Sequence, residues 1–148
     1  MSNKIHLTVA TLVTKAEKFL MVSETDRNIT VLNQPAGHVE PGENIFDAAI
    51  RETLEETGWQ VALTDFLGIY TYKSSANEIT YYRMCFVAEP VHKNNSQPLD
   101  PEIKGVHWMT AEQIRQSDYP HRSPLVSRCL EDYLEGQIFP LEIFCNPL

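Results

Sequence analysis

The chain has 148 residues, a length typical of one domain, and its composition (43% hydrophobic, 22% charged) is that of a globular protein. Its net charge of −8, with 12 Lys and Arg against 20 Asp and Glu, argues against duplex nucleic acid and anionic membranes as partners. The sequence shows no signal peptide, no apolar run of transmembrane length, and three cysteines that fit no zinc-binding spacing. We therefore expect a single domain over residues 1–148 that is cytoplasmic, keeps its thiols reduced, and is a monomer or homodimer.

Strand patterns dominate the first part of the chain. Alternating apolar residues over 5–13 predict a strand, and residues 18–23 predict a second one. A turn is expected at 26–28, followed by a short extended segment over 29–34. Because Pro and Gly then interrupt the pattern, a loop is expected from Gly37 to Glu43.

The next segment, Ile45 to Thr57, is predicted to be a helix. Asn44 is a suitable N-cap, Asp47 suits the positive end of the helix dipole, and Gly58 stands where a terminating glycine belongs. An apolar stripe on this helix is predicted to face the core. Its members are Phe46, Ile50 and Leu54.

The C-terminal half continues with strands and short helices. Three strands are predicted, over residues 66–72, 79–89 and 106–109. Thr110 and Gln113 form a capping-box pattern that opens a short helix. A last helix is expected to begin at Ser123-Pro124 and to end near Gly136. Without regular βαβ alternation, this order predicts an α/β (α+β) fold with a mixed sheet between helices.

Three carboxylates share one face of the predicted helix. On a helical wheel that starts at the first helical residue, Glu52, Glu55 and Glu56 fall at about 340°, 280° and 20°. No Lys or Arg is expected at i±3 or i±4 on this arc to relieve their repulsion. Such a cluster of hard oxygen ligands suits Mg²⁺, with Mn²⁺ as an alternative. The competing interpretation is a solvated acidic face.

The spacing of residues around this helix resembles the Nudix box, which reads Gly, five residues, Glu, seven residues, Arg-Glu-x-x-Glu-Glu-x-Gly. The matching positions are Gly37, Glu43, Arg51, Glu52, Glu55, Glu56 and Gly58. Thr53 and Trp59 stand where the family usually has an aliphatic residue, and both are packing positions. The resemblance implies the Nudix fold, a mixed β-sheet sandwiched between helices, and Mg²⁺-dependent hydrolysis of a phosphoanhydride bond.

The resemblance also implies roles for the residues of the box. The implied metal ligands are the carboxylates of Glu52, Glu55 and Glu56 and the backbone carbonyl of Gly37. Arg51 and Glu43 are expected to form a structural salt bridge, because the guanidinium fork suits orienting a carboxylate.

Two carboxylates are candidates for the base that accepts a proton from the attacking water. A base is needed because the nucleophile must lose a proton as it attacks. Glu52 is one candidate. Glu102 is the other, since family members often carry an acid in the loop before the strand that here holds Trp108; it could equally be a solvated loop acid.

Three flanking segments narrow the resemblance to the NudJ phosphatase branch of the family. They are residues 33–38, 122–126 and 136–142. This branch removes a terminal phosphate from thiamine-precursor (hydroxymethyl) pyrimidine diphosphate, thiamine diphosphate and nucleoside di- and triphosphates. The implied partner is therefore a small phosphorylated molecule, and the implied product is orthophosphate.

Candidate substrate contacts lie outside the box. Arg83 and Arg122 are candidates for holding phosphate, and Arg122 precedes an anion-friendly helix N-terminus. Aromatic rings that could stack on a pyrimidine, or could simply pack in strands, are Tyr81, Tyr70, Tyr72 and Tyr82. His38 and His121 could contact substrate or be ordinary surface histidines.

Two alternative functions remain open. One is a Nudix pyrophosphatase of another specificity, such as one that acts on nucleotide sugars or dinucleoside polyphosphates. The other is a non-catalytic binding module, although such a module would typically lack a carboxylate of the box.

Overall fold

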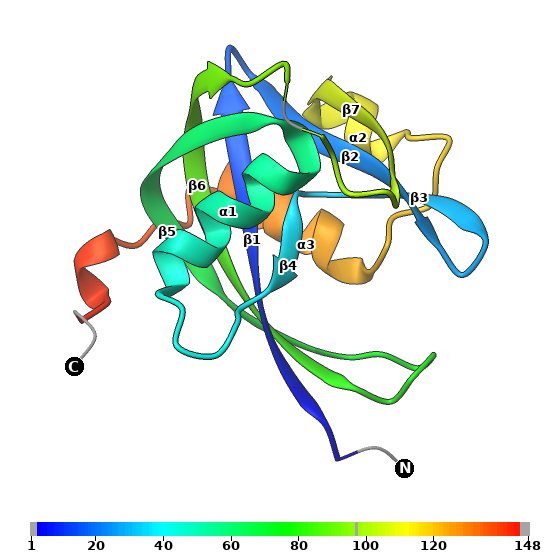
Figure 1. Cartoon of the computed structure of the whole chain (residues 1–148), viewed down its shortest axis with the longest axis horizontal. Helices are drawn as coiled ribbons and strands as arrows, with labels where there is room; N and C mark the ends of the chain where they lie inside the picture. The colour runs from blue at the N-terminus through cyan, green and yellow to red at the C-terminus, as the bar shows by residue number, and fades with distance from the viewer. Residues whose placement is uncertain (1–2, 97, 146–148) are drawn as a thin grey trace.

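The computed structural model describes residues 3–96 and 98–145. Within them a mixed sheet of seven strands lies between helices, with α1 (Ile45–Thr57) on one face and α3 (Pro124–Leu134) on the other (Figure 1). The strands are β1 (Ile5–Lys15), β2 (Lys18–Asp26), β3 (Ile29–Asn33), β4 (Ala36–His38), β5 (Trp59–Lys73), β6 (Thr80–Lys93) and β7 (Ile103–Thr110). The remaining elements are α2 (Ala111–Arg115) and the 3₁₀ turn Leu141–Ile143. The predicted fold class is confirmed.

Strand β1 is the centre of the sheet. It runs parallel to β6 over nine residue pairs, from Ile5 opposite Thr80 to Val13 opposite Ala88, and β5 then pairs antiparallel with β6. At its other end β1 turns sharply into β2, which carries β3 and β7 on its two sides. The strand order is β3-β2-β1-β6-β5, with β4 added to β1 and β7 to β2.

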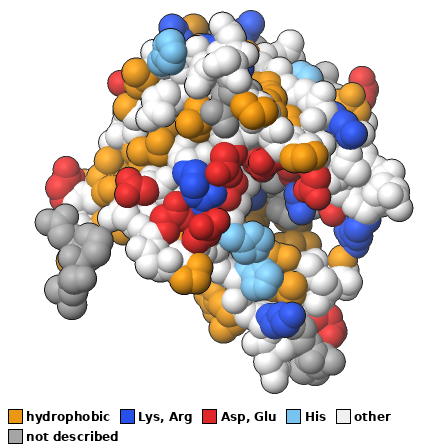
Figure 2. Space-filling view, in the orientation of Figure 1, with side chains coloured by type: hydrophobic (Ala, Val, Ile, Leu, Met, Phe, Trp, Pro, Cys, Tyr) orange, Lys and Arg blue, Asp and Glu red, His pale blue; other side chains and the backbone are white. Residues whose placement is uncertain are grey.

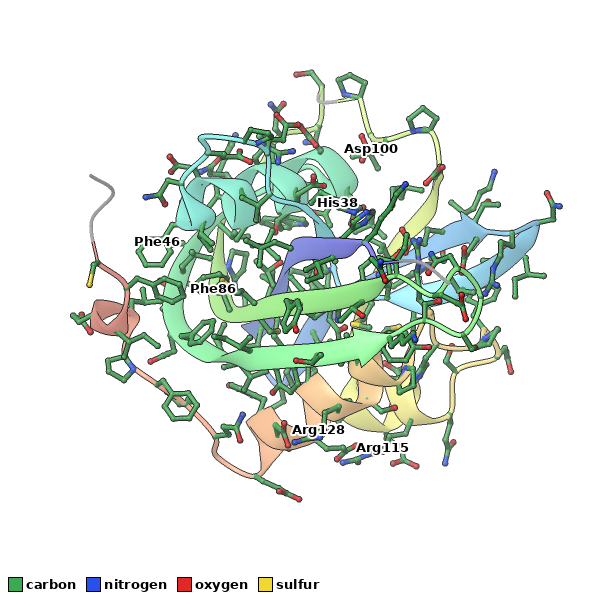
Figure 3. The ribbon with its side chains drawn as sticks, turned by 90° about the horizontal axis from the view of Figure 1, so that it is seen from below. His38, Phe46, Phe86, Asp100, Arg115 and Arg128 are labelled. Atoms are coloured by element: carbon green, nitrogen blue, oxygen red, sulfur yellow. The ribbon has the colours of Figure 1, made fainter. Side chains whose placement is uncertain are left out.

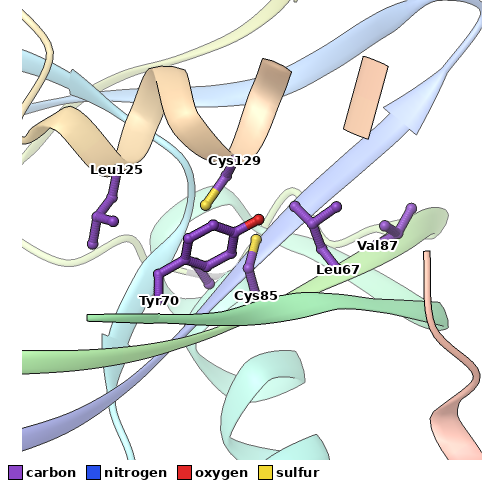
Figure 4. Packing of buried hydrophobic residues seen from close by; sticks show 7 residues of the cluster. Leu67, Tyr70, Cys85, Val87, Leu125 and Cys129 are labelled. Carbon is purple, nitrogen blue, oxygen red and sulfur yellow. The ribbon is translucent and has the colours of Figure 1, made fainter. Parts of the chain in front are cut away.

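The core lies on both faces of β1 because its residues alternate between the two helix layers. Val9 packs in the cluster that includes Ala48 and Ala49 of α1, whereas Ala10 packs in the cluster that includes Cys129 of α3. On the α3 side the ring of Tyr70 lies among apolar side chains, with the sulfur atoms of two buried cysteines pointing toward one another (Figure 4).

Helix α1 has the predicted bounds and caps. The side chain of Asn44 accepts a hydrogen bond from the backbone N–H of Phe46, and Gly58 adopts φ +77° and donates to the carbonyl of Leu54. In contrast, the prediction that Phe46, Ile50 and Leu54 form the core-facing stripe is correct only in part, since Phe46 and Ile50 pack against core clusters whereas none of the described clusters includes Leu54.

The residues of α1 that lie deepest are small or polar. They are Ala48, Ala49, Thr53, Glu56 and Thr57, while the three larger apolar residues are half-buried at the sides of the helix. Small side chains let α1 approach the sheet closely, and this approach carries its carboxylates inward. The hydroxyl of Thr53 accordingly lies 2.7 Å from the hydroxyl of Thr11 on β1.

Two strand predictions need correction. The expected loop from Gly37 begins as strand β4, in which Ala36, Gly37 and His38 pair with β1. A three-residue strand between Pro and Gly is too short to show an alternating pattern. Strand β5 begins at Trp59 rather than at residue 66, because register shifts near Val61, Asp65 and Gly68 break the alternation over its first half.

The C-terminal helices begin as predicted. Thr110 and Gln113 cap α2 reciprocally, and the Ser123 side chain caps α3 with Pro124 as its first residue. No helix in the described part of the chain is both long and apolar enough to span a lipid bilayer.

Candidate active site

A cleft of about 680 Å³ opens beside α1. Glu52 and Glu56 of α1 line one side of it, and Arg83 of β6 and Arg122, just before α3, line another. Figure 2 shows acidic side chains gathered over this face, next to a hollow that is bordered by histidine and basic side chains.

Three carboxylates converge at the acidic end of the cleft, and one of them, Glu52, lines the cleft itself. Glu52, Glu55 and Asp100 each place one carboxylate oxygen within 4.8 Å of the other two. Asp100 arrives there because its backbone N–H donates to the carbonyl of Glu55 at 3.1 Å, which ties its loop to α1. Within this loop Glu102 was the predicted candidate and Asp100 was missed, although the acidic character of the segment is visible in the sequence.

Glu56 lies deeper than the other carboxylates. It is 8% exposed and its side chain accepts a hydrogen bond from the backbone N–H of Ala36 at 3.0 Å. Burial raises the pKa of Glu56 to about 9. Burial also raises the pKa of Glu52 and that of Asp100 above their ordinary values. Keeping these buried carboxylates ionised therefore costs free energy, and binding protons or a cation would lower that cost.

Arg51 binds the carboxylates together. Its Nε and Nη2 donate to the two oxygens of Glu43 at 2.7 and 2.8 Å, so the ion pair expected from the box is present. Its Nη1 also donates to Glu52 at 2.9 Å and to Glu55 at 3.2 Å. The expectation that no basic residue relieves the acidic arc is therefore wrong, since Arg51 stands at i−4 from Glu55. Hydrogen bonding from Arg51 lowers the pKa of Glu43 to about 2.

Gly37 is required by close packing against Glu52. A Cβ atom at this position would collide with the carboxylate group of Glu52. The glycine thus allows β4 to pass directly beneath the side chain, and both residues line the cleft.

Further acids line the cleft from outside the helix, among them Glu102 and Glu24. Glu102 is exposed at the rim, and its backbone carbonyl accepts from Thr25. Glu24 of β2 is only 3% exposed and accepts from Arg122 at 2.7 Å and from the amide of Asn33 at 3.1 Å. No local pattern indicates a role for Glu24, because a single acid near the end of a strand is usually solvated.

The other candidate contacts divide into two groups. His38, Tyr72 and Tyr81 line the cleft. The ring of His38 lies 3.0 Å from that of His6, and burial, followed by the nearby His6, lowers the pKa of His38 (Figure 3).

The remaining three aromatic and histidine candidates do not line the cleft. Tyr70 packs in the core on the α3 side and donates its hydroxyl to Asp132 at 2.9 Å, so the stacking role is wrong for this residue. His121 lies within hydrogen-bonding distance of Ser127 and of the carbonyl of Ile114. Tyr82 lies on β6 between Tyr81 and Arg83, which line the cleft, but is not itself a lining residue.

The acidic end of the cleft fits a divalent cation. Ligands to Mg²⁺ lie about 2 Å from the ion, so their oxygens must come within about 4 Å of one another. Small rotations of Glu52, Glu55 and Asp100 satisfy this requirement from their present separation. All three are carboxylates, the ligand type that hard cations prefer.

The fold is a mixed sheet between helices, and one helix carries carboxylates beside a cleft, next to a strand that contains a glycine. This arrangement is that of the Nudix class of proteins. The comparison of sequences agrees, since residues 4–129 match the NUDIX domain. The chain belongs to the Nudix family and is a Nudix hydrolase.

The relatives cover nearly the whole chain. Phosphatase NudJ from Escherichia coli K12 is 37% identical over 140 residues, which is 95% of this chain and 90% of that protein. A NUDIX hydrolase structure from Nitrosomonas europaea is 39% identical, with a TM-score of 0.93 over 97% of this chain and 98% of that one. The NUDIX domain of Shewanella oneidensis NrtR, solved with ADP ribose, shares the fold at 15% identity, with a TM-score of 0.69 over 90% of each chain.

Proposed function

We propose that this protein is a Mg²⁺-dependent hydrolase that removes the terminal phosphate from small organic di- and triphosphates. The observation that carries the proposal is the cleft itself, whose lining includes the carboxylates of Glu52 and Glu56 together with Arg83 and Arg122. A polyphosphate needs both, because a cation bridges its oxygens to the acids while guanidinium groups bind its remaining charge. The likeness to NudJ phosphatases supports orthophosphate as the product.

The reaction is a single displacement at the terminal phosphorus. Water forms the new oxygen–phosphorus bond, the bridging oxygen leaves with the organic product shortened by one phosphate, and the terminal phosphoryl group becomes orthophosphate. Glu52, Glu55, Glu56 and Asp100, with the carbonyl of Gly37, would hold Mg²⁺ or Mn²⁺. The bound cation would lower the pKa of a water and neutralise charge on the phosphoryl oxygens.

The proton acceptor that we propose is Glu102. The carboxylate of Glu52 is engaged by Arg51 and belongs to the cation-binding group, whereas Glu102 is exposed at the rim of the cleft. An exposed carboxylate can take the proton of the water and pass it to solvent. Glu102→Gln should then lower turnover while Mg²⁺ binding, measured by calorimetry, stays unchanged.

The organic group would lie at the end of the cleft that is formed by the β5–β6 hairpin. Tyr72, Tyr81 and the residues 74–77 line this end. Two aromatic rings with a polar hairpin tip provide stacking without a specific hydrogen-bonding pattern for one base, which favours tolerance among organic groups.

The test is a product analysis by ³¹P NMR with hydroxymethylpyrimidine diphosphate, thiamine diphosphate and a nucleoside triphosphate. We expect orthophosphate and the organic product shortened by one phosphate from each, and the loss of all three activities when the cation is chelated. A variant Arg115→Gln, on the far surface, controls for a change in charge (Figure 3). Pyrophosphate from the triphosphate, with both diphosphates intact, would refute the phosphatase proposal and favour another Nudix specificity.

A further inference from the structure

The two arginines of the cleft differ in how their charges are balanced. Arg122 donates to the carboxylate of Glu24 at 2.7 Å and lies 3.9 Å from that of Asp26. Arg83 is 6% exposed, yet within the described residues no carboxylate lies at ion-pair distance from it. Its charge is therefore buried at the cleft wall without an acidic partner.

Neutral amides hold Arg83 in place. Its Nη1 donates to the side-chain oxygen of Gln34 at 3.2 Å and its Nη2 to that of Asn33 at 3.3 Å. Gln34 is itself fixed by donating to the carbonyl of Val126 in α3 at 2.9 Å. These contacts orient the guanidinium, but amide oxygens do not neutralise it, and burying an unbalanced charge is costly.

Asn33 also separates Arg83 from the nearest carboxylate in this network. Its amide nitrogen donates to Glu24 while its amide oxygen accepts from Arg83. An acid at this position would pair with Arg83 directly. Arg83 also forms a hydrogen bond with the buried thiol of Cys129. Hydrogen bonding to Cys85 lowers the pKa of this thiol, burial opposes that shift, and the charge and hydrogen bond of Arg83 lower it further.

The position of Arg83 along the cleft indicates which phosphate group of the substrate it binds. Thr8 of β1 pairs with His38 of β4 on one side and with Arg83 of β6 on the other. Arg83 is thus two strand spacings, about 10 Å at the backbone, from the strand beneath the carboxylates. Along β6 it is two residues from Tyr81, on the same face of the strand. It therefore lies between the reacting end of the cleft and the end for the organic group.

We propose that Arg83 forms the subsite for the phosphate that remains on the organic product, and that Asn33 is its positioning residue. The inference rests on the proposed function, because the phosphate that is cut must lie at the carboxylate end. The retained phosphate supplies the anion that Arg83 lacks, in a geometry that the guanidinium fork matches with two hydrogen bonds. Arg122, already paired with Glu24, contributes little to this subsite.

The decisive variant is Asn33→Asp, which changes the size of the side chain very little. The new carboxylate would neutralise Arg83 and also repel Glu24. We expect affinity for an organic monophosphate, such as AMP or thiamine monophosphate, to fall at least about tenfold, since a charge-assisted pair is lost. The affinity for inorganic phosphate should stay within about twofold, and the KM for the diphosphates should rise more than kcat falls.

Binding is measured by calorimetry with Mg²⁺, on wild type, Asn33→Asp, Arg83→Gln and the surface control Arg115→Gln, with melting temperatures to verify folding. Arg83→Lys, which keeps the charge without the fork, provides a second folded variant and should lose an intermediate share of affinity. Unchanged AMP binding in folded Asn33→Asp and Arg83→Gln would overturn the proposal. Equal loss of AMP and inorganic phosphate would overturn it too, because Arg83 would then hold the terminal phosphate.

This measurement does not depend on the reaction product. An organic monophosphate remains both after release of orthophosphate from a diphosphate and after release of pyrophosphate from a triphosphate. The subsite can therefore be correct even where ³¹P NMR refutes the phosphatase proposal, and it can fail where the phosphatase proposal holds.

Discussion

At the scale of single residues, the carboxylates at the acidic end of the cleft differ in how far each is exposed to solvent. Glu56 is nearly closed off, whereas the side chain of Glu55 is 37% exposed on the same helix. Both occupy positions of the Nudix box, and burial raises the pKa of Glu56 to about 9. Two residues of one motif thus differ in their contact with solvent.

The pKa of Glu56 has a measurable consequence for stability. In cation-free protein, the folded state keeps the proton on Glu56 between pH 4.5 and about 9, where the unfolded chain has released it. The folded state then binds more protons, so the free energy of unfolding should fall as pH rises through this window, by up to about 1.4 kcal/mol per pH unit. Urea unfolding in chelator at several pH values measures this slope, and Glu56→Gln should reduce it.

Glu55→Gln is the matched control for that experiment. It removes the same charge from the same helix at a position where solvent already hydrates the carboxylate, and should leave the slope in place. Added Mg²⁺ should weaken or reverse the slope in wild type, because the cation displaces the proton. A slope that is the same in Glu56→Gln as in wild type would contradict the assignment of the raised pKa.

Single residues also mark the limit of prediction from sequence. The spacing of the box was enough to place Glu52, Glu55 and Glu56 on one side of α1, because helical geometry converts spacing into direction. Asp100 and Glu24 reach the same cleft from other strands and loops. Their positions depend on tertiary pairing, such as the hydrogen bond from Asp100 to the carbonyl of Glu55, which no local pattern encodes.

At the scale of elements, the pairing of β4 with α1 determines the geometry of the acidic end. Gly37→Ala should displace Glu52, because the added Cβ collides with its carboxylate group while the backbone is fixed by pairing with Val9. We expect at least a tenfold loss of turnover and weaker Mg²⁺ binding, measured by steady-state kinetics and calorimetry. Wild-type values for both would show that β4 can move without consequence.

Gly42→Ala, in the loop between the same two elements, is the control. A Cβ there meets nothing within 4 Å, but the backbone has φ +79°. This variant should lose about 1 kcal/mol of stability through backbone strain and keep its activity. The pair therefore separates a steric effect on the site from a general loss of stability.

The elements predicted most accurately are those whose ends are marked by local sequence patterns. Side-chain caps and a terminating glycine fixed the bounds of α1, since these interactions are local. Strands were less regular. β4 is stabilised only by its place beside β1, and the bulges of β5 hide its alternation. The deepest positions of α1 were not predicted because close approach to the sheet selects Ala48, Ala49 and Thr53 over larger side chains.

At the scale of the whole molecule, the two faces of the sheet offer separate probes of one predicted domain. The indole rings of Trp59 and Trp108 lie in edge-to-face contact at 5.8 Å and report on the cluster around Val13 and Leu20. The buried thiols of Cys85 and Cys129 report on the α3 side, whereas Cys145 is exposed and reacts without unfolding.

We expect the two probes to give the same transition in urea. Residues of β1 contribute to the core on both faces, so neither helix layer can lose its packing without disturbing the other. Tryptophan fluorescence and pulsed labelling of the two buried thiols should therefore have coincident midpoints. Saturating Mg²⁺ should raise both midpoints equally, because ligand binding stabilises the whole cooperative unit although the cation contacts only one end of α1. Separate midpoints, or a Mg²⁺ effect confined to fluorescence, would show that the α3 layer unfolds independently and that the chain is not one domain.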